Sequence, residues 1–290
     1  MSDLEEFEGQ RSRLRAIAYR MLGSNADAED VVQEAYLRWR DRSDRAVEST
    51  ASYLATIVVR LCIDELRSAR VRRESYVGPW LPEPLLVDDA DPGAAAELAD
   101  SLSLAFLVLL EELAPVERAA FLLHDVFDYE YDEISGMLGR GEPACRQLVS
   151  RARRRVGERR HRFDADQREG RELAERFLLA CAEGDLEGLL AVVSEDVVLW
   201  TDGGGVVKAA RRPIHGASKV GRFLIGVAKG IPPETEFRPA LVNGEPGYVF
   251  VVNDVVTTTL SFDILDGKIV GVTSVLNPDK LHGLSLKDGA

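Results

Sequence analysis

Residues Tyr131–Arg160, with the sequence YDEISGMLGRGEPACRQLVSRARRRVGERR, have the pattern of two short helices joined by a tight turn. Apolar residues at spacings of three and four predict a first helix that ends at Gly139. A second helix is expected to follow, with Pro143 in its first turn, where a missing N–H costs nothing. Its predicted inward stripe consists of Cys145, Leu148, Val149, Ala152 and Val156. Such a pair of helices is typical of a helix–turn–helix.

The second of these helices carries a dense arginine cluster. Between Arg146 and Arg162 the sequence has eight arginines and one acid, Glu158, although the whole chain has 49 acidic and 36 basic residues. Positive charge concentrated in this way indicates a nucleic-acid backbone as partner. The outward N-terminal half of a second helix enters the major groove, so Arg146 and Gln147 are expected to read base edges. The alternative is a surface helix with a solvated basic face.

The composition sets broad bounds. A chain of 290 residues with 46% hydrophobic residues has room for two or three packed domains. No apolar run approaches a membrane span, the acidic N-terminus lacks a signal-peptide core, and the scattered Cys62, Cys145 and Cys181 fit a reduced cytoplasm. We expect no metal and no cofactor. The formal charge of −13 argues against coating nucleic acid alone and favours a larger partner that holds the chain on DNA.

The helical periodicity divides the first half of the chain into three segments. Residues 1–73 are predicted to form three helices, at Arg13–Leu22, Asn25–Arg40 and Ser52–Arg73, with Asn25 or Asp27 capping the second and Ser49 or Thr50 the third. Residues 74–93 form a proline-rich linker whose apolar side chains are unusual for a plain spacer. Residues 94–163 are again helical and contain the helix–turn–helix, preceded by helices at Ala94–Leu113 and Pro115–Val126.

Residues 168–290 change in character. Two helices, Glu169–Glu183 and Leu186–Val193, precede a series of strand-like runs, including Val206–Ala210, and one further helix at Ser218–Ala228. Turns are predicted at Gly244–Gly247 and at Asp266–Gly267. This order predicts an α+β domain with a curved antiparallel sheet folded over a helix.

Three segments in series resemble one family. Ala26–Trp39 (ADAEDVVQEAYLRW) resembles the core-binding helix of a bacterial RNA polymerase sigma factor of the extracytoplasmic-function type. Tyr53–Glu74 resembles the adjoining helix that melts and reads the −10 promoter element, and Pro115–Arg154 is similar to the region that reads the −35 element. The resemblance implies two partners, core RNA polymerase and promoter DNA.

The resemblance also implies site residues. Contacts to core polymerase are expected from Glu29, Asp30, Gln33 and Glu34. Contacts to the −10 element are expected from Arg60, Arg67, Arg70 and Arg73. Contacts to the −35 element are expected from Arg146, Gln147, Ser150, Arg151 and Arg154. Tyr53 and Tyr76 are candidates to stack on opened bases or, equally, to pack within the protein.

Three further motifs resemble a subgroup of sigma factors with a SnoaL-like C-terminal domain, which implies a cone-shaped fold and regulation in cis. The motifs are Trp80-Leu81-Pro82-Glu83-Pro84, Asp202-Gly203-Gly204-Gly205 and Asn277-Pro278-Asp279-Lys280-Leu281. We expect the linker to dock through Trp80, Leu81 and Pro82, with the glycines allowing close approach. The chain departs from the subgroup where Val206 and Val207 precede Lys208, and where Gly141 replaces the usual serine before the recognition helix.

Two other functions compete with a sigma factor. The first is a DNA-binding transcription regulator whose SnoaL-like domain senses a small-molecule effector. The second is an enzyme of the cone-fold class, with Trp200, Asp202, His215 and Asp254 as pocket residues. No carboxylate and imidazole are paired in the sequence, so we expect no enzyme activity.

Overall fold

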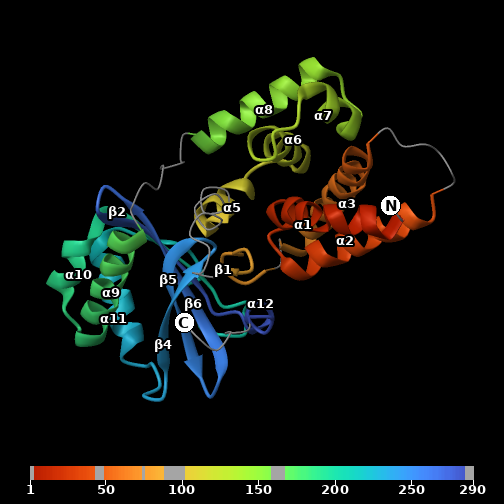
Figure 1. Cartoon of the computed structure of the whole chain (residues 1–290). Coiled ribbons are helices and arrows are strands. Elements are labelled where there is room, and N and C mark those ends of the chain that lie inside the picture. Colours follow the sequence, from red (N-terminus) through yellow and green to blue (C-terminus); the bar gives the residue numbers. More distant parts are fainter. Residues whose placement is uncertain (1–2, 43–48, 74–75, 88–101, 158–166, 285–290) are drawn as a thin grey trace. The chain divides into compact units, whose positions relative to one another are not determined.

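A computed structural model describes residues 3–42, 49–73, 76–87, 102–157 and 167–284. The chain divides into two compact units, which are described separately (Figure 1). Unit 1 comprises Met1–Ser75 and Leu107–Arg160, and unit 2 comprises Tyr76–Phe106 and His161–Ala290. The two helical segments expected to touch DNA therefore belong to one packed body, and the linker belongs with the last segment. Among the described residues, no helix is both long and apolar enough to cross a membrane.

The first three helices of unit 1 are α1 (Asp3–Leu22), α2 (Asn25–Arg40) and α3 (Thr50–Arg73). Helix α1 begins ten residues before the predicted start at Arg13, because acidic residues occupy its first turn and Phe7 supplies a buried anchor. The predicted caps of α2 were wrong: Ser24 is the N-cap, and its hydroxyl accepts from the Asp27 backbone N–H at 3.2 Å. Ser49 accepts from the Ser52 N–H, as one of the two predicted caps of α3.

The helix–turn–helix is confirmed. Helix α6 (Pro115–Asp125) precedes α7 (Tyr131–Leu138) and α8 (Glu142–Gly157). Gly139 ends α7 in the left-handed region at φ 62°, as predicted. All five residues of the predicted inward stripe of α8 are buried. Residues 94–101 of the predicted helix Ala94–Leu113 lie outside the described residues, and the described helix α5 (Leu104–Leu110) ends three residues before the predicted end.

Unit 2 is built on one open, seven-stranded sheet. Its strands follow the spatial order β1, β4, β5, β6, β7, β2 and β3, and every neighbouring pair is antiparallel except β2 with β7. The strands are β1 (Leu86–Val87), β2 (Val193–Asp202), β3 (Ile214–His215), β4 (Glu236–Val242), β5 (Glu245–Val252), β6 (Val255–Leu265) and β7 (Lys268–Val275). Because β1 comes from the linker, the linker extends the sheet edge.

Three helices cover one face of this sheet, as Figure 1 shows. They are α9 (Gln167–Glu183), α10 (Leu186–Val192) and α11 (Ala217–Ala228), and a short helix α12 (Pro278–Leu281) follows the last strand. The core on this face centres on Phe177 of α9 and Phe262 of β6, whose ring centroids are 4.9 Å apart. The predicted α+β class with a curved antiparallel sheet over a helix is confirmed, except that β2 and β7 pair in parallel.

Two local predictions in unit 2 were wrong. Val206–Ala210 forms no strand, because the backbone turns sharply where the Gly203 carbonyl accepts from the N–H groups of Val206 and Val207. The β4–β5 turn is made by Asn243 and Gly244, both at positive φ, so Glu245–Gly247 already belongs to β5. The Asp266–Gly267 turn was predicted correctly, and both residues again have positive φ.

The sheet face opposite the helices carries a buried carboxylate. Asp263 of β6 lies opposite Gly271 of β7, and its side chain fills the space that a β-carbon at Gly271 would occupy. Burial raises the pKa of Asp263 to about 7. Between about pH 4 and pH 7 the folded chain therefore keeps a proton that the unfolded chain has released, and this group weakens folding as the pH rises through that window.

We accordingly expect Asp263→Asn to stabilise the chain by a few kcal/mol at pH 8 and by much less at pH 4, since the amide never has to lose a proton. The measurement is denaturant unfolding at both pH values. Asp266→Asn, an exposed change in the turn of the same hairpin, is the matched control and should not stabilise the chain at pH 8. An equal effect of Asp263→Asn at the two pH values would contradict the prediction.

Candidate promoter-binding surface and linker clamp

The outward face of α8 carries basic and polar side chains that differ in how firmly other residues hold them. Gln147, Ser150 and Arg154 are exposed on it. Arg146 is also exposed, but its guanidinium lies 4.2 Å from the Tyr131 ring centroid and pairs with Glu142 at 3.0 Å. This contact holds the Arg146 guanidinium against the start of α7. All five residues predicted for the −35 element, Arg151 included, thus lie at the surface of one helix.

Acidic residues of α6 hold the remaining arginines of α8. Arg153 makes two hydrogen bonds to Asp125, at 2.7 and 2.9 Å. Arg151 and Arg155 both pair with Glu117, at 3.3 and 2.8 Å. These bonds brace α8 on α6, so Arg151 has a structural partner in addition to its predicted role on DNA.

The residues predicted to bind core polymerase lie on α2. Asp30 and Gln33 are exposed, and Glu29 and Glu34 are half-buried. Glu29 pairs with Arg11 and lies 3.7 Å from Arg15, whereas Glu34 pairs with Arg38 one turn further along at 2.9 Å. The face is therefore polar and mixed in charge, with Asp30 and Gln33 its most exposed members.

The residues predicted for the −10 element have different environments. Arg67 is exposed on α3 and pairs with Asp64 at 3.1 Å, while the side chains of Arg70 and Arg73 lie outside the described part of the structure. Arg60 instead contacts α7: its Nε donates to the Met137 carbonyl at 3.0 Å and its Nη2 to that of Gly136 at 3.3 Å. Both aromatic candidates pack within the protein. Tyr53 lies beside Trp39, and Tyr76 is described next.

In unit 2 a buried aspartate joins the linker to the C-terminal domain. Asp202 at the end of β2 has no exposed surface, and its two carboxylate oxygens accept from the Tyr76 hydroxyl at 2.6 Å and the Leu81 N–H at 2.9 Å. They also accept from the Gly204 N–H at 2.9 Å and from the Lys280 ammonium at 2.7 Å. We call the set Tyr76, Leu81, Asp202, Asn277 and Lys280 the linker clamp.

The other members of the linker clamp complete its hydrogen bonding. The Asn277 amide donates to the Tyr76 hydroxyl at 2.9 Å and caps α12 by accepting from the Asp279 N–H. Lys280 also donates to the Leu81 carbonyl and lies 4.2 Å from the Trp80 ring centroid. Burial, followed by the hydrogen bond to Asp202, raises the pKa of the Tyr76 hydroxyl above its ordinary value, so it remains a donor.

The glycines after Asp202 let the backbone of this loop lie close to the linker and to Asn277. Gly204 adopts φ 63°, and a β-carbon there would collide with the Asn277 side chain. Gly205 faces Val77 of the linker, with 3.1 Å between an added β-carbon and the valine Cβ. Of the other predicted contact residues, Leu81, Pro82 and Leu281 are buried, whereas Pro278 and Asp279 are exposed. Lys208 is exposed too, and it does not take part in the linker clamp.

Sequence reasoning missed the second attachment of the linker. The Leu85 backbone makes two hydrogen bonds to Asn243 in the β4–β5 turn: its N–H donates to the Asn243 side-chain oxygen at 2.8 Å, and its carbonyl accepts from the Asn243 N–H at 2.7 Å. β1 then pairs with β4. An asparagine before a glycine is a hairpin signal, but nothing in the sequence indicates that its side chain binds a segment 158 positions away.

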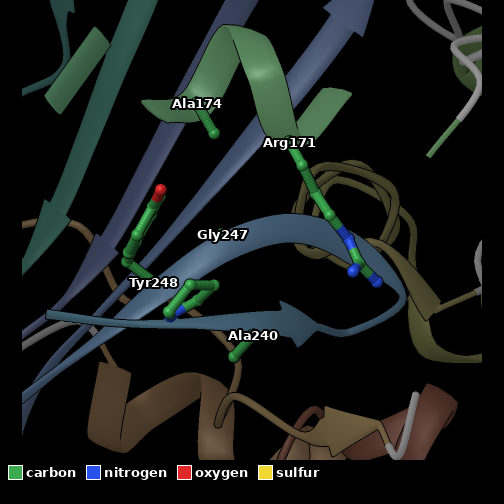
Figure 2. A pocket seen from close by; sticks show the side chains of 6 residues that line it. Arg171, Ala174, Ala240, Gly247 and Tyr248 are labelled. Carbon is green, nitrogen blue, oxygen red and sulfur yellow. The ribbon is translucent and has the colours of Figure 1, made fainter. Parts of the chain in front are cut away.

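The predicted pocket residues do not come together. Asp202 belongs to the linker clamp, His215 is exposed on the short strand β3, and Asp254 lies in the β5–β6 turn at φ 61°. A hollow of about 40 Å³ lies instead between α9 and strands β4 and β5, lined by Arg171, Ala174, Pro239, Ala240, Gly247 and Tyr248 (Figure 2). Sites for drug-sized ligands measure roughly 300–1,000 Å³, so this hollow has space for a few water molecules.

Known proteins resemble the chain in both its helical part and its full length. The family models for Sigma-70 region 2 and Sigma-70 region 4 match residues 7–72 and 103–156. The ECF RNA polymerase sigma factor SigJ of Mycobacterium tuberculosis is 38% identical over 298 residues, covering 99% of this chain and 95% of that protein. SigI of the same species is 32% identical and covers 98% and 96%.

A solved structure extends the likeness to the fold. The crystal structure of the M. tuberculosis extracytoplasmic function sigma factor SigJ has a TM-score of 0.78 and 36% identity, and it covers 98% of this chain and 100% of that one. The helix–turn–helix, the α2 and α3 helices and the sheet domain thus recur together in order. The chain belongs to the ECF family of RNA polymerase sigma factors.

Proposed function

We propose that the chain directs promoter-specific initiation in the cytoplasm by binding core RNA polymerase, and that its C-terminal domain modulates this activity in cis. In this proposal the exposed face of α2 binds core polymerase. The arginines of α3 hold the −10 element, and Arg146, Gln147, Ser150, Arg151 and Arg154 of α8 bind the −35 element. The observation that carries the regulatory part is the linker clamp, because one buried carboxylate bonds both the linker and the segment after the last strand.

In this proposal the linker clamp limits the distance that the linker can span between the two DNA-reading helical segments. Segment 74–103 joins α3 to α5 and spans up to about 100 Å when fully extended, at roughly 3.4 Å per residue. Docking of residues 76–87 on unit 2 fixes the span of these residues, which fully extended would contribute up to about 40 Å. Linker docking therefore limits how far the −10 and −35 helices separate, and its release increases that separation.

Reconstituted transcription tests both parts. The purified chain is added to sigma-free core polymerase with a promoter fragment, and wild type is compared with Asp202→Asn and Tyr76→Phe. We expect wild type to initiate at the promoter and both variants to differ from it in the same direction, since each weakens the linker clamp. Glu195→Gln, an exposed change on the same strand, is the control. Variants that initiate like wild type would reject cis-regulation, and a wild type without initiation would reject the sigma function itself.

The proposed −35 contacts lead to a separate prediction. In the holoenzyme, Gln147→Ala is expected to reduce discrimination against a mutated −35 base by about 1–3 kcal/mol, because a base-edge contact is lost. Arg154→Ala should weaken binding to all sequences and lower the slope of log affinity against log salt by about 1, as loss of one phosphate contact does. The measurement is promoter binding at several salt concentrations. Identical profiles for the two variants would contradict these assignments.

A further inference from the structure

One arginine of α8 lies against an aromatic pair that belongs to the two helices before it. The Arg146 guanidinium is 4.2 Å from the ring centroid of Tyr131, the first residue of α7. The Tyr131 ring in turn lies 4.2 Å from the ring of His124 in α6, with 36° between the two ring planes. Side chains of α6 and α7 therefore support a residue of α8 that is predicted to read bases.

Both rings are held in place by the rest of the helix–turn–helix. His124 bonds the Tyr129 carbonyl at 3.0 Å, and because a carbonyl only accepts, the His124 Nδ1 carries a proton and donates. Tyr131 is half-buried and packs on the hydrophobic cluster of Ala120, Leu148 and Val149. The aromatic pair is thus a fixed surface, and an arginine that lies against it has fewer rotamers to lose when it binds DNA.

The contact with the ring leaves Arg146 able to bind a base. A cation–π contact uses the charge of the guanidinium and needs no particular N–H group. The bond from the Arg146 Nη2 to Glu142 uses one of five N–H donors. The remaining donors suffice for a bidentate contact to O6 and N7 of a guanine, which is the commonest specific contact of arginine in the major groove.

Glu142 favours a base over a phosphate as the target of Arg146. Its carboxylate lies 3.0 Å from the Arg146 guanidinium, one turn earlier on α8. A phosphate bound by Arg146 would lie close to this negative charge and be repelled, whereas the edge of a guanine is uncharged. The N-terminal part of a recognition helix is also the part that reaches base edges.

We propose that Tyr131 is a positioning residue for promoter recognition, which holds the Arg146 guanidinium in the direction needed to read one guanine of the −35 element. The specificity of α8 is then set in part by α6 and α7, through a side chain that does not touch the base. The inference rests on the proposed function of the chain as a sigma factor.

Promoter binding by the reconstituted holoenzyme tests this role one base pair at a time. Each G·C pair of the −35 element is changed to A·T in turn, and the loss of affinity measures discrimination at that pair. Arg146→Ala identifies the pair that Arg146 reads, because discrimination is lost there. We expect Tyr131→Leu to lower discrimination at the same pair by about tenfold, the order of one bidentate base contact.

Three further variants separate the ring from the hydroxyl and from the fold. Tyr131→Phe keeps the ring and should retain most of the discrimination. Tyr131→Met fills the space without a ring and should behave like Tyr131→Leu. Arg154→Ala, an exposed change on the same helix, is the control, because loss of a phosphate contact weakens all fragments alike. A loss with Tyr131→Phe as large as with Tyr131→Leu would assign the effect to the hydroxyl and overturn the proposal.

A double-mutant cycle distinguishes positioning from a merely structural role. In the Arg146→Ala background, Tyr131→Leu is expected to change discrimination at no base pair, since the side chain that it positions is absent. An effect of Tyr131→Leu that is equal at every pair, or that persists without Arg146, would overturn the proposal, as would an Arg146→Ala chain that discriminates like wild type. A wild-type chain that does not initiate at the unaltered promoter would instead count against the sigma function.

Discussion

Asp202→Ala is expected to destabilise unit 2 by about 3–5 kcal/mol and to release the linker, because the change leaves a buried ammonium without its counter-charge. Lys280 is 8% exposed at its side chain and pairs with a carboxylate that has no exposed surface. The same change also leaves the Tyr76 hydroxyl and the Leu81 N–H without their acceptor. Thermal unfolding should show the loss, and limited proteolysis should show faster cleavage within residues 76–87.

Two further variants separate charge from packing in this prediction. Lys280→Met added to Asp202→Ala is expected to recover part of the stability, since no unpaired charge remains buried. Asp202→Asn keeps the shape of the side chain and should lie between wild type and Asp202→Ala. Unchanged proteolysis of the linker in Asp202→Ala would mean that the linker clamp does not hold it.

Arg118→Met is expected to destabilise unit 1 by a similar amount, about 3–5 kcal/mol, because this arginine is buried and bonded on both sides. Its Nη1 donates to the Met21 carbonyl and to Glu111 at 2.8 Å, and its side chain is 3% exposed. Methionine has a similar length but donates no hydrogen bond, so the end of α1 and the Glu111 carboxylate each lose the bond that Arg118 makes to them.

The reactivity of Cys62 measures how far Arg118→Met loosens unit 1. It is fully buried in α3, and burial raises the pKa of its thiol far above the ordinary value. We expect thiol labelling at Cys62, followed by mass spectrometry of the labelled peptides, to accelerate in Arg118→Met. Labelling at Cys181 in unit 2 serves as the internal reference and should stay constant. Arg140→Met, an exposed change in the turn before α8, should leave both rates unchanged. A stable Arg118→Met chain with slow Cys62 labelling would refute the prediction.

The sequence predicted the helix–turn–helix and the β6–β7 turn well because both depend on local chemistry. Gly139 and the Asp266–Gly267 pair adopt positive φ that few other residues accept, and the stripe on α8 follows directly from helical spacing. The β4–β5 turn was misplaced because Pro246 and Gly247 look like turn residues, although Pro246 sits in β5 opposite Leu241 of β4. Pairing with a distant strand overrode the local signal.

The roles of individual polar residues were harder to predict. Asp202 was identified as part of a docking loop, but its four donors come from positions between 76 and 280. Arg60 and Arg118 look like ordinary helical arginines, and only the tertiary packing places each at the end of another helix. Periodicity indicates which face of a helix is buried, and it contains no information about which distant carbonyl a long side chain reaches.

The long sequence separation within the linker clamp has a consequence for synthesis on the ribosome. Lys280 follows Leu81 by 199 positions, and both are bonded to Asp202. At about 5–20 residues per second, the linker emerges on the order of ten seconds or more before the lysine that neutralises Asp202. The DNA-reading helices are therefore expected to fold first, before the linker clamp can form. Protease protection of residues 76–87 in stalled nascent chains should begin only after residue 280 has emerged.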